Sequence, residues 1–261
     1  MFDFHLHSSI SFDSSSPAPD MCRAAQELGL KEICFTDHYD YKTDPADTPD
    51  LFSLERYRLA YDALEFSGLS IRKGVEFGMT VWNAPQLDSL LKACSFDFVI
   101  GSVHYVAGHD PYEAAYWEGI NIYEAFRKYL QGVLDCVKVH SSFDVLGHLT
   151  YVCKSPHNPS HSGVPFDDFR DLTDEIMKLL ITKGIGMELN TSGVDRAHTF
   201  LPSREYLQRF KELGGEIVTV GSDAHNATRV GQYVPEALAL LKDIFGHVCT
   251  FENRKPVFHK L

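Results

Sequence analysis

The sequence predicts an α/β fold in which a parallel sheet closes into a barrel. Seven short apolar segments alternate with seven helical segments, a pattern typical of parallel strands joined by crossover helices. No linker or low-complexity stretch interrupts the pattern, and 261 residues suit an α/β barrel. We therefore expect a single domain over residues 1–261. An open doubly wound sheet is the alternative, although no dinucleotide or P-loop glycine fingerprint follows a predicted strand.

The predicted strands are short apolar runs, most of which lead into a polar residue. They cover residues 2–7, 32–38, 69–76, 96–102, 143–147, 185–189 and 216–220. The first run is too short for a helix, and its alternation places His5 and His7 on the same face. Residues 248–258 are a candidate for a final short strand.

The predicted helices carry apolar residues at three- and four-residue spacing between capping residues and glycines. They cover residues 21–28, 54–64, 87–93, 120–139, 169–179, 203–213 and 235–245. Asp20 is a suitable N-cap for the first helix, and Ser203 for the sixth. Pro235 is well placed to open the last helix. Between residues 38 and 54 we expect a long polar loop.

The composition narrows the classes of partner. A net charge of −12 disfavours nucleic acid and anionic membranes, which attract basic surfaces. A small phosphorylated substrate is compatible with this charge because bound divalent cations would offset it locally. No apolar run reaches the length of a membrane span, and no signal peptide is evident. Six scattered cysteines without a C-x-x-C pair are typical of reduced thiols, so we expect a cytoplasmic protein.

Residue types that bind metals recur at the carboxyl ends of the predicted strands. They are His5, His7, His38, Glu76, His104, His148, Asp223 and His225. Each alone would more often be a core or surface residue, but barrel enzymes assemble their active sites from several strand ends at this face. The recurrence in register with the topology therefore predicts a metal site.

The number and type of these ligands predict the kind of metal centre. Histidines with carboxylates suit zinc, iron or manganese. Eight ligands exceed what one tetrahedral ion uses, so we expect two or three divalent transition-metal ions. Glu76 is the natural bridge, because its two oxygens can bind two ions.

An ordered set of motifs resembles the polymerase-and-histidinol-phosphatase (PHP) family. The set comprises the opening H-x-H, Thr36-Asp37-His38, Glu76, Gly101-Ser102-Val103-His104, Gly147-His148 and Gly221-Ser222-Asp223-Ala224-His225. The resemblance spans residues 1 to about 232 and implies a distorted (β/α)7 TIM-like barrel with a trinuclear metal site. The length, the D-V-L-G-H run and the E-L-N-T-S-G-V-D-R segment are most similar to monofunctional members that hydrolyse L-histidinol phosphate in histidine biosynthesis.

The resemblance also implies how the ligands are shared. One ion would take His5, His7, Glu76 and Asp223; a second Glu76, His104 and His148; and a third Asp13, His38 and His225. Asp13 stands where many relatives carry a histidine, and from the residues alone it would be a turn or cap residue. Asp37 and Ser222 are expected to support the ligands or the structure rather than bind metal.

The implied reaction is attack on phosphorus by a hydroxide formed from metal-bound water, whose pKa falls to about 7. Glu76, Asp223 and His225 are the residues we expect to carry this chemistry. Arg196 is the first candidate to bind the substrate phosphate, and Arg229 and Lys154 are further candidates, with a surface role as the alternative for each.

Two other functions remain as alternatives. A PHP-type nuclease or nucleotide phosphoesterase would need a basic groove, which the net charge of −12 disfavours. A metal-binding regulatory module without catalysis would be expected to have lost ligands, whereas every ligand position here is filled by a competent residue. The sequence leaves open the oligomeric state, the native metal and the acid that protonates the leaving group.

Overall fold

Seven parallel strands form the centre of the molecule. In the computed structural model, which describes residues 1–261, they run around the sheet in the order β1 (Phe2–Leu6), β2 (Glu32–Phe35), β5 (Ser70–Gly78), β6 (Phe98–Ser102), β7 (Val145–Leu146), β8 (Gly186–Asn190) and β9 (Val218–Gly221). Each neighbouring pair is parallel. The alternating α/β pattern predicted from the sequence is therefore confirmed.

The sheet nearly closes on itself because β1 and β9 meet. Leu6 forms a parallel bridge with Ala224. The amide of Asp223 donates to the carbonyl of His5 at 2.9 Å, and the amide of His7 donates to the carbonyl of Ala224 at 2.9 Å. The predicted distorted barrel is confirmed in preference to the open sheet, and its closure brings the first and last metal-binding motifs together.

The barrel is distorted around β5, which pairs with two different strands on one side. Residues 70–73 pair with β2, whereas residues 76–78 pair with β3 (His38–Asp40). β3 also pairs antiparallel with β4 (Asp50–Leu51), so the loop predicted between residues 38 and 54 contains two short strands. The register places His38 directly beside Glu76.

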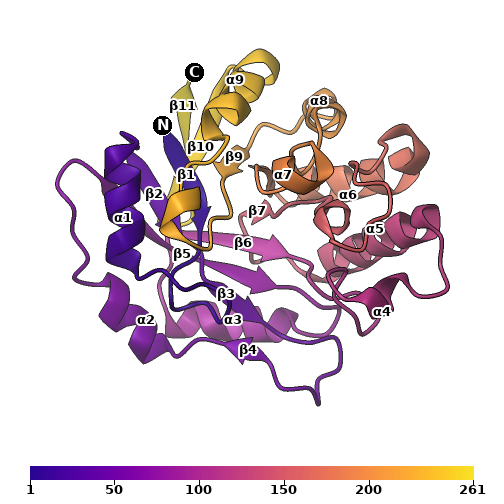
Figure 1. Cartoon of the computed structure of the whole chain (residues 1–261), viewed down its shortest axis with the longest axis horizontal. Coiled ribbons are helices and arrows are strands. Elements are labelled where there is room, and N and C mark those ends of the chain that lie inside the picture. The colour runs from indigo at the N-terminus through magenta and orange to yellow at the C-terminus, as the bar shows by residue number, and fades with distance from the viewer.

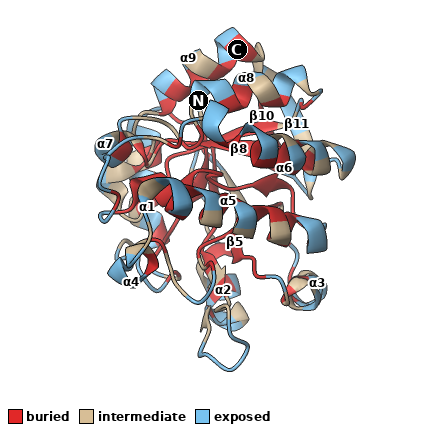
Figure 2. Cartoon of the chain, turned by 90° about the vertical axis from the view of Figure 1, so that its right-hand side faces the viewer, coloured by how far each residue is buried: buried red, intermediate tan, exposed pale blue.

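Helices cover the outside of the strands (Figure 1). The helices of the chain are α1 (Ala18–Glu27), α2 (Leu54–Tyr61), α3 (Ala84–Ala93), α4 (Ala114–Trp117), α5 (Ile122–Val139), α6 (Arg170–Thr182), α7 (Val194–Ala197), α8 (Arg204–Glu212) and α9 (Val234–Ile244), with 3-10 turns η1 (Tyr151–Lys154), η2 (Asp167–Phe169) and η3 (Ala227–Arg229). Of these, α7, η1 and η3 lie at the end of the barrel that carries the polar site. The buried faces of the covering helices point to the strands and their exposed faces to solvent (Figure 2). This is the arrangement that three- and four-residue apolar spacing predicts.

Three details differ from the sequence-based expectations. Asp20 lies inside the first turn of α1 rather than at its N-cap, because the helix already begins after Pro17. From the sequence, the D-x-H motif is expected to repeat the geometry of the opening H-x-H, but the chain leaves β9 at Gly221, Asp223 has a φ of +56° and Ala224 forms only an isolated bridge. The tail forms a hairpin of β10 (His247–Glu252) and β11 (Lys255–Lys260) rather than one strand.

The hairpin packs against an apolar cluster separate from the main core. The cluster joins Phe4, Cys34, Phe98, Ile100 and Val145 of the barrel strands to Cys249 and Phe251 of β10. All of these side chains are buried. The polar ligands follow these apolar residues along the strands, so one end of the barrel is closed by hydrocarbon and the other carries the polar site.

Candidate metal centre

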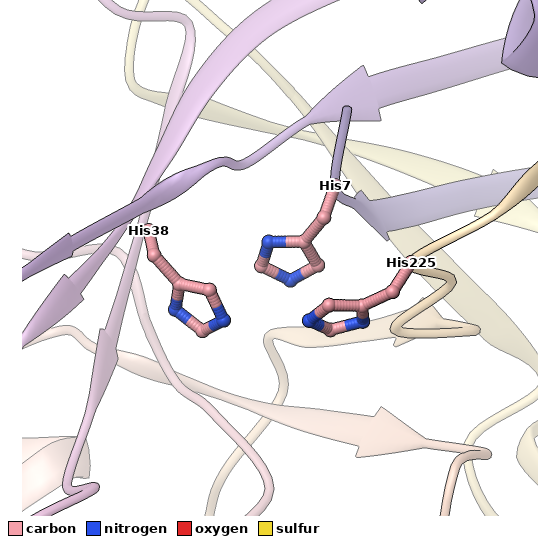
Figure 3. Close-up of side chains that lie close together, drawn as sticks. All are labelled: His7, His38 and His225. Atoms are coloured by element: carbon pink, nitrogen blue, oxygen red, sulfur yellow. The ribbon is translucent and has the colours of Figure 1, made fainter. Parts of the chain in front are cut away.

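All nine predicted metal ligands come together at the carboxyl ends of the barrel strands. They are His5, His7, Asp13, His38, Glu76, His104, His148, Asp223 and His225. Figure 3 shows three of them, His7, His38 and His225, with their rings turned toward one another. The rings of His38 and His225 lie 4.3 and 4.1 Å from that of His7, between centroids. Seven separate segments of the chain thus contribute to one polar cluster.

The first group of ligands comes from the two ends of the chain and from β5. Nε2 of His5 lies 3.1 Å from Oε2 of Glu76 and 3.7 Å from Oδ1 of Asp223. Nε2 of His7 lies 3.4 Å and 3.3 Å from the same two oxygens. Two imidazoles and two carboxylates therefore offer four ligand atoms around one point, which matches the donor set of a divalent transition metal.

The second group uses the other oxygen of Glu76. Its Oε1 lies 3.2 Å from Nε2 of His104 and 2.8 Å from Nε2 of His148. One carboxylate oxygen thus faces the first group and its partner faces the second. Glu76 is completely buried, so this bridging position is held inside the protein.

The third group lies at the rim. Oδ2 of Asp13 is 3.0 Å from Nε2 of His225 and 3.5 Å from Nε2 of His38. The side chains of Asp13 and His225 are 35% and 28% exposed, whereas those of the other two groups are almost fully buried. The arrangement predicts that an ion in this group exchanges with solvent more readily than the other ions.

Buried atoms without hydrogen bonds indicate that the first group fits a metal. Nε2 of His5, Nε2 of His7 and Oε2 of Glu76 are buried and make no hydrogen bond, although they lie close together. A buried polar atom without a partner is unfavourable and is rare in proteins. Convergent lone pairs of nitrogen and oxygen are the donor set that a divalent cation satisfies, so these residues fit the implied ion.

Two further carboxylates orient the ligands and were not predicted. Oε1 of Glu188 lies 2.6 Å from Nδ1 of His5, and Oδ2 of Asp40 lies 2.7 Å from Nδ1 of His104. A carboxylate on the far nitrogen fixes the tautomer and orientation of a metal-binding imidazole. The spacing that relates His5 to His7 also relates His38 to Asp40, and this signal was available in the sequence.

Asp37 supports the site, as predicted, through a serine. It accepts hydrogen bonds from the amide of Ser8 at 2.7 Å and from the hydroxyl of Ser11 at 2.9 Å. Oγ of Ser11 also lies 3.1 Å from Nδ1 of His7. The hydroxyl of Tyr61 donates a further hydrogen bond to Asp37. This buried network holds the His7 ring from behind.

Burial and the charges of the cluster shift the pKa values of its residues in different directions. Burial lowers the pKa of His104, but the carboxylates of Asp40 and Glu76 outweigh burial and raise it to about 10. Burial and the neighbouring His225 hold the pKa of His7 well below its usual value. Burial alone would raise the pKa of Glu76, but the surrounding imidazoles hold it well below its usual range. The bridging carboxylate is therefore ionised at neutral pH.

Comparison with known proteins places the chain in a family. The sequence-family model named PHP domain matches residues 3–192, which is most of the chain. The chain belongs to the PHP domain family. Histidinol-phosphatase from Lactococcus lactis is 32% identical over 260 residues, covering 97% of this chain and 95% of the relative. A probable histidinol-phosphatase from Clostridium acetobutylicum is 29% identical, covering 99% and 96%.

A solved structure of a histidinol phosphate phosphatase has the same fold. The crystal structure of histidinol phosphate phosphatase from Lactococcus lactis, in complex with zinc, L-histidinol and phosphate, aligns with a TM-score of 0.84. The alignment covers 98% of each chain at 28% identity. The distorted barrel of the PHP family is therefore the fold of this chain. None of the helices combines the length with the apolar character that a membrane-spanning segment needs.

A cavity of about 420 Å³ opens over the ligands of this PHP domain. Its walls include Lys154, Arg196 and Arg229, so the structure brings all three predicted phosphate-binding residues to one pocket. Nζ of Lys154 lies 2.7 Å from Oδ2 of Asp223, and Nη2 of Arg229 lies 3.0 Å from a carboxylate oxygen of Asp195. Arg196 makes no ion pair and is exposed, which leaves its guanidinium available to a ligand.

Two neighbouring aromatic residues, Tyr116 and Trp117, pack in and against the main core of the PHP domain and do not line this cavity. Tyr116 is buried, and its hydroxyl donates to the carbonyl of Ala125 at 2.7 Å. The indole of Trp117 donates to the carbonyl of Pro111 at 2.7 Å. The aromatic residues that do line the cavity include Tyr112 and Tyr151.

Proposed function

We propose that this chain hydrolyses L-histidinol phosphate to L-histidinol and inorganic phosphate, a step of histidine biosynthesis. The observation that carries the proposal is the convergence of nine metal ligands beneath a cavity lined by three cationic side chains. The histidinol-phosphatases among its relatives, which match over nearly their whole length, support this substrate. We place the activity in one domain over residues 1–261 and in the cytoplasm, where six unpaired cysteines would stay reduced.

Two or three divalent ions of zinc, iron or manganese would occupy the cluster. His5, His7, Glu76 and Asp223 would hold the first, and Glu76, His104 and His148 the second. Asp13, His38 and His225 would hold the third. When bound, such ions acidify a water molecule for attack on phosphorus and neutralise the charge of the phosphate.

The chain itself supplies orientation and charge for this reaction. Glu76 and Asp223 each place a carboxylate oxygen near the imidazoles of the first group, and His225 faces the cavity. Arg196 is proposed to clamp the phosphate oxygens, because its guanidinium is not engaged by any carboxylate. Arg229 would assist from its ion pair with Asp195. Lys154 is proposed to act mainly by holding Asp223, with its remaining N–H directed to the phosphate.

The charge of the cavity favours a small phosphate ester over a nucleic acid. Besides its cations, the cavity is lined by five aspartates, namely Asp13, Asp40, Asp110, Asp195 and Asp223. A phosphodiester backbone requires a continuous basic surface. The proposed substrate carries one phosphate, for which the three cations and the metals suffice.

The experiment that tests the function measures phosphate release together with metal content. The substrates are L-histidinol phosphate, p-nitrophenyl phosphate and single-stranded DNA. We expect kcat/KM for L-histidinol phosphate to exceed that for the aryl phosphate and DNA to remain intact. Comparable turnover of DNA, or no turnover of L-histidinol phosphate by metal-loaded protein, would contradict the proposal.

A further inference from the structure

Most charged side chains that line the cavity already have a partner of opposite charge or belong to the metal cluster. Asp13 and Asp223 are proposed metal ligands, and Lys154 is paired with Asp223. Asp40 lies against His104. Asp195 accepts from Arg229 at 3.0 Å and from the hydroxyl of Tyr233 at 2.7 Å.

Asp110 and Arg196 are the two exceptions. Neither makes an ion pair within the chain, and both line the cavity. The carboxylate of Asp110 accepts only from the amide of Tyr112 at 2.8 Å and from the hydroxyl of Tyr151 at 3.2 Å. One negative and one positive charge therefore remain available to a ligand in the same pocket.

Tyrosines hold these two free charges at defined positions. The guanidinium carbon of Arg196 lies 5.7 Å from the centre of the Tyr112 ring, while the backbone of Tyr112 binds Asp110. The ring of Tyr151 lies 5.3 Å from that of His104 and 5.0 Å from that of His148. Asp110 is thus separated from the second metal group by a single tyrosine.

Burial makes the environment of Asp110 suited to a cation. Burial raises the pKa of Asp110, and the hydrogen bond from Tyr112, the charge of a protonated His104 and the hydrogen bond from Tyr151 counteract this only in part. A carboxylate that is partly removed from water and has no cationic partner gains from a positively charged ligand. The rings of Tyr112 and Tyr151, with centroids 5.4 Å apart, add faces that attract a cation.

We propose that Asp110 binds a positively charged nitrogen on the alcohol portion of the substrate, while Arg196 and the metal ions bind its phosphate. The site would therefore select zwitterionic phosphate monoesters over those whose only charge is on the phosphate. This inference rests on the proposed phosphatase activity and assigns the residue that recognises the leaving group. Near pH 8 an ammonium group is still charged whereas an imidazole is mostly neutral, so an amine is the cation tested at that pH.

The test compares esters whose alcohol portion is cationic (charged esters) with esters whose alcohol portion carries no charge (uncharged esters), in metal-loaded wild type and Asp110→Asn at pH 8. One pair is L-histidinol phosphate and 3-phenylpropyl phosphate, and the other is 3-aminopropyl phosphate and n-butyl phosphate. In Asp110→Asn the ratio of kcat/KM, charged over uncharged, should fall on the order of 10- to 100-fold in both pairs, as expected for loss of a charged hydrogen-bond partner. An unchanged ratio in active Asp110→Asn protein would overturn the proposal.

Asp195→Asn is the matched control, because Asp195 lines the same cavity but is already paired with Arg229. It should lower kcat/KM for charged and uncharged esters by the same factor. A fall in the ratio equal to that of Asp110→Asn would assign the effect to general loss of negative charge and overturn the proposal.

The two ester pairs allow the proposed function and the proposed role of Asp110 to be tested independently. If wild type does not turn over L-histidinol phosphate, the proposed function fails. The role of Asp110 is then decided by the aminopropyl and butyl esters alone: a wild-type preference for the amine that Asp110→Asn removes supports it, and no such preference overturns it.

Discussion

Nδ1 of His5 lies 2.6 Å from Oε1 of Glu188 inside the barrel. The other oxygen of Glu188 accepts a hydrogen bond from the amide of His148 at 2.8 Å. Glu188 thus orients the ring of one proposed ligand and the backbone of another. Its side chain is only 1% exposed, so water cannot take over either interaction.

Glu188→Gln should weaken metal binding without unfolding the protein. The amide keeps the size of the side chain but loses the negative charge that makes the imidazole of His5 a strong metal ligand. We expect the dissociation constant for Zn²⁺ to rise on the order of 10- to 100-fold. The measurement is competition with a chromophoric chelator. Asp144→Asn is the control, because this buried carboxylate pairs with Arg254 away from the site and should leave Zn²⁺ affinity unchanged. Equal affinities in Glu188→Gln and wild type would contradict this role.

Replacing the bridging glutamate should cost more than replacing the rim aspartate. Glu76 presents one oxygen to each of two ligand groups, whereas Asp13 contacts only the partly exposed third group. We expect Glu76→Gln to lower kcat/KM about 10²- to 10³-fold, because buried imidazoles lose their compensating charge. Asp13→Asn should lose less. Metal content by mass spectrometry and phosphate release check both variants, and equal losses would contradict the sharing of Glu76.

The predictable and the unpredictable parts of the site differ in a physical way. His5 and His7 follow from sequence because strand alternation aims every second residue at one face, and Glu76 and His148 because they stand at the carboxyl ends of predicted strands. Asp13 required the family resemblance, since an aspartate in a serine-rich loop has no periodicity to place it. The D-x-H motif is expected from the sequence to repeat the geometry of the opening H-x-H, but Asp223 reaches the same cluster with a positive φ, after the chain has left β9.

Glu188 and Asp40 were missed because their role depends on pairs of strands rather than on one strand. Glu188 sits in the middle of β8, not at its end, and meets His5 only after β1 closes the barrel against β9. Asp40 was placed in a loop, because the three-residue strand β3 carries too few apolar residues to be recognised. The C-terminal hairpin was predicted as one strand because the tight turn was not recognised. Asn253 and Arg254, both with positive φ, form this turn.

Metal binding should release protons. Burial lowers the pKa of His104, but Asp40 and Glu76 raise it to about 10, so in metal-free protein this imidazole is protonated at pH 7. An imidazole must be neutral to bind a metal through Nε2. Burial also lowers the pKa of His5, but the carboxylates of Glu188 and Glu76 outweigh burial and raise this pKa well above its usual value.

Titration calorimetry of metal-free protein with Zn²⁺ at pH 7, in buffers of different ionisation enthalpy, measures this release. The observed enthalpy should depend on the buffer, with at least about one proton released per chain. The release should shrink as the pH rises toward 10, where His104 loses its proton before the metal arrives. A buffer-independent enthalpy at pH 7 would show that the imidazoles are already neutral.

Arg196 should matter more for phosphate than Arg229. The guanidinium of Arg196 is unpaired, whereas that of Arg229 is held by Asp195. Arg196→Ala is expected to lower kcat/KM on the order of 10- to 100-fold and to weaken inhibition by inorganic phosphate in parallel. Arg196→Lys should retain more of the wild-type kcat/KM than Arg196→Ala but not all of it, because an ammonium group lacks the planar fork of a guanidinium group. Arg229→Ala is the matched comparison, and a larger loss there would reverse the assignment.

The central claim is that a cluster of two or three ions, held by nine side chains, carries the hydrolysis of a phosphate ester. The most direct measurement titrates metal-free protein with Zn²⁺ or Mn²⁺ while following phosphate release from L-histidinol phosphate and the number of ions bound per chain. Metal-free protein should be inactive, and activity should rise until two or three ions are bound. Full activity without metal, or activity complete at one ion per chain, would contradict the account.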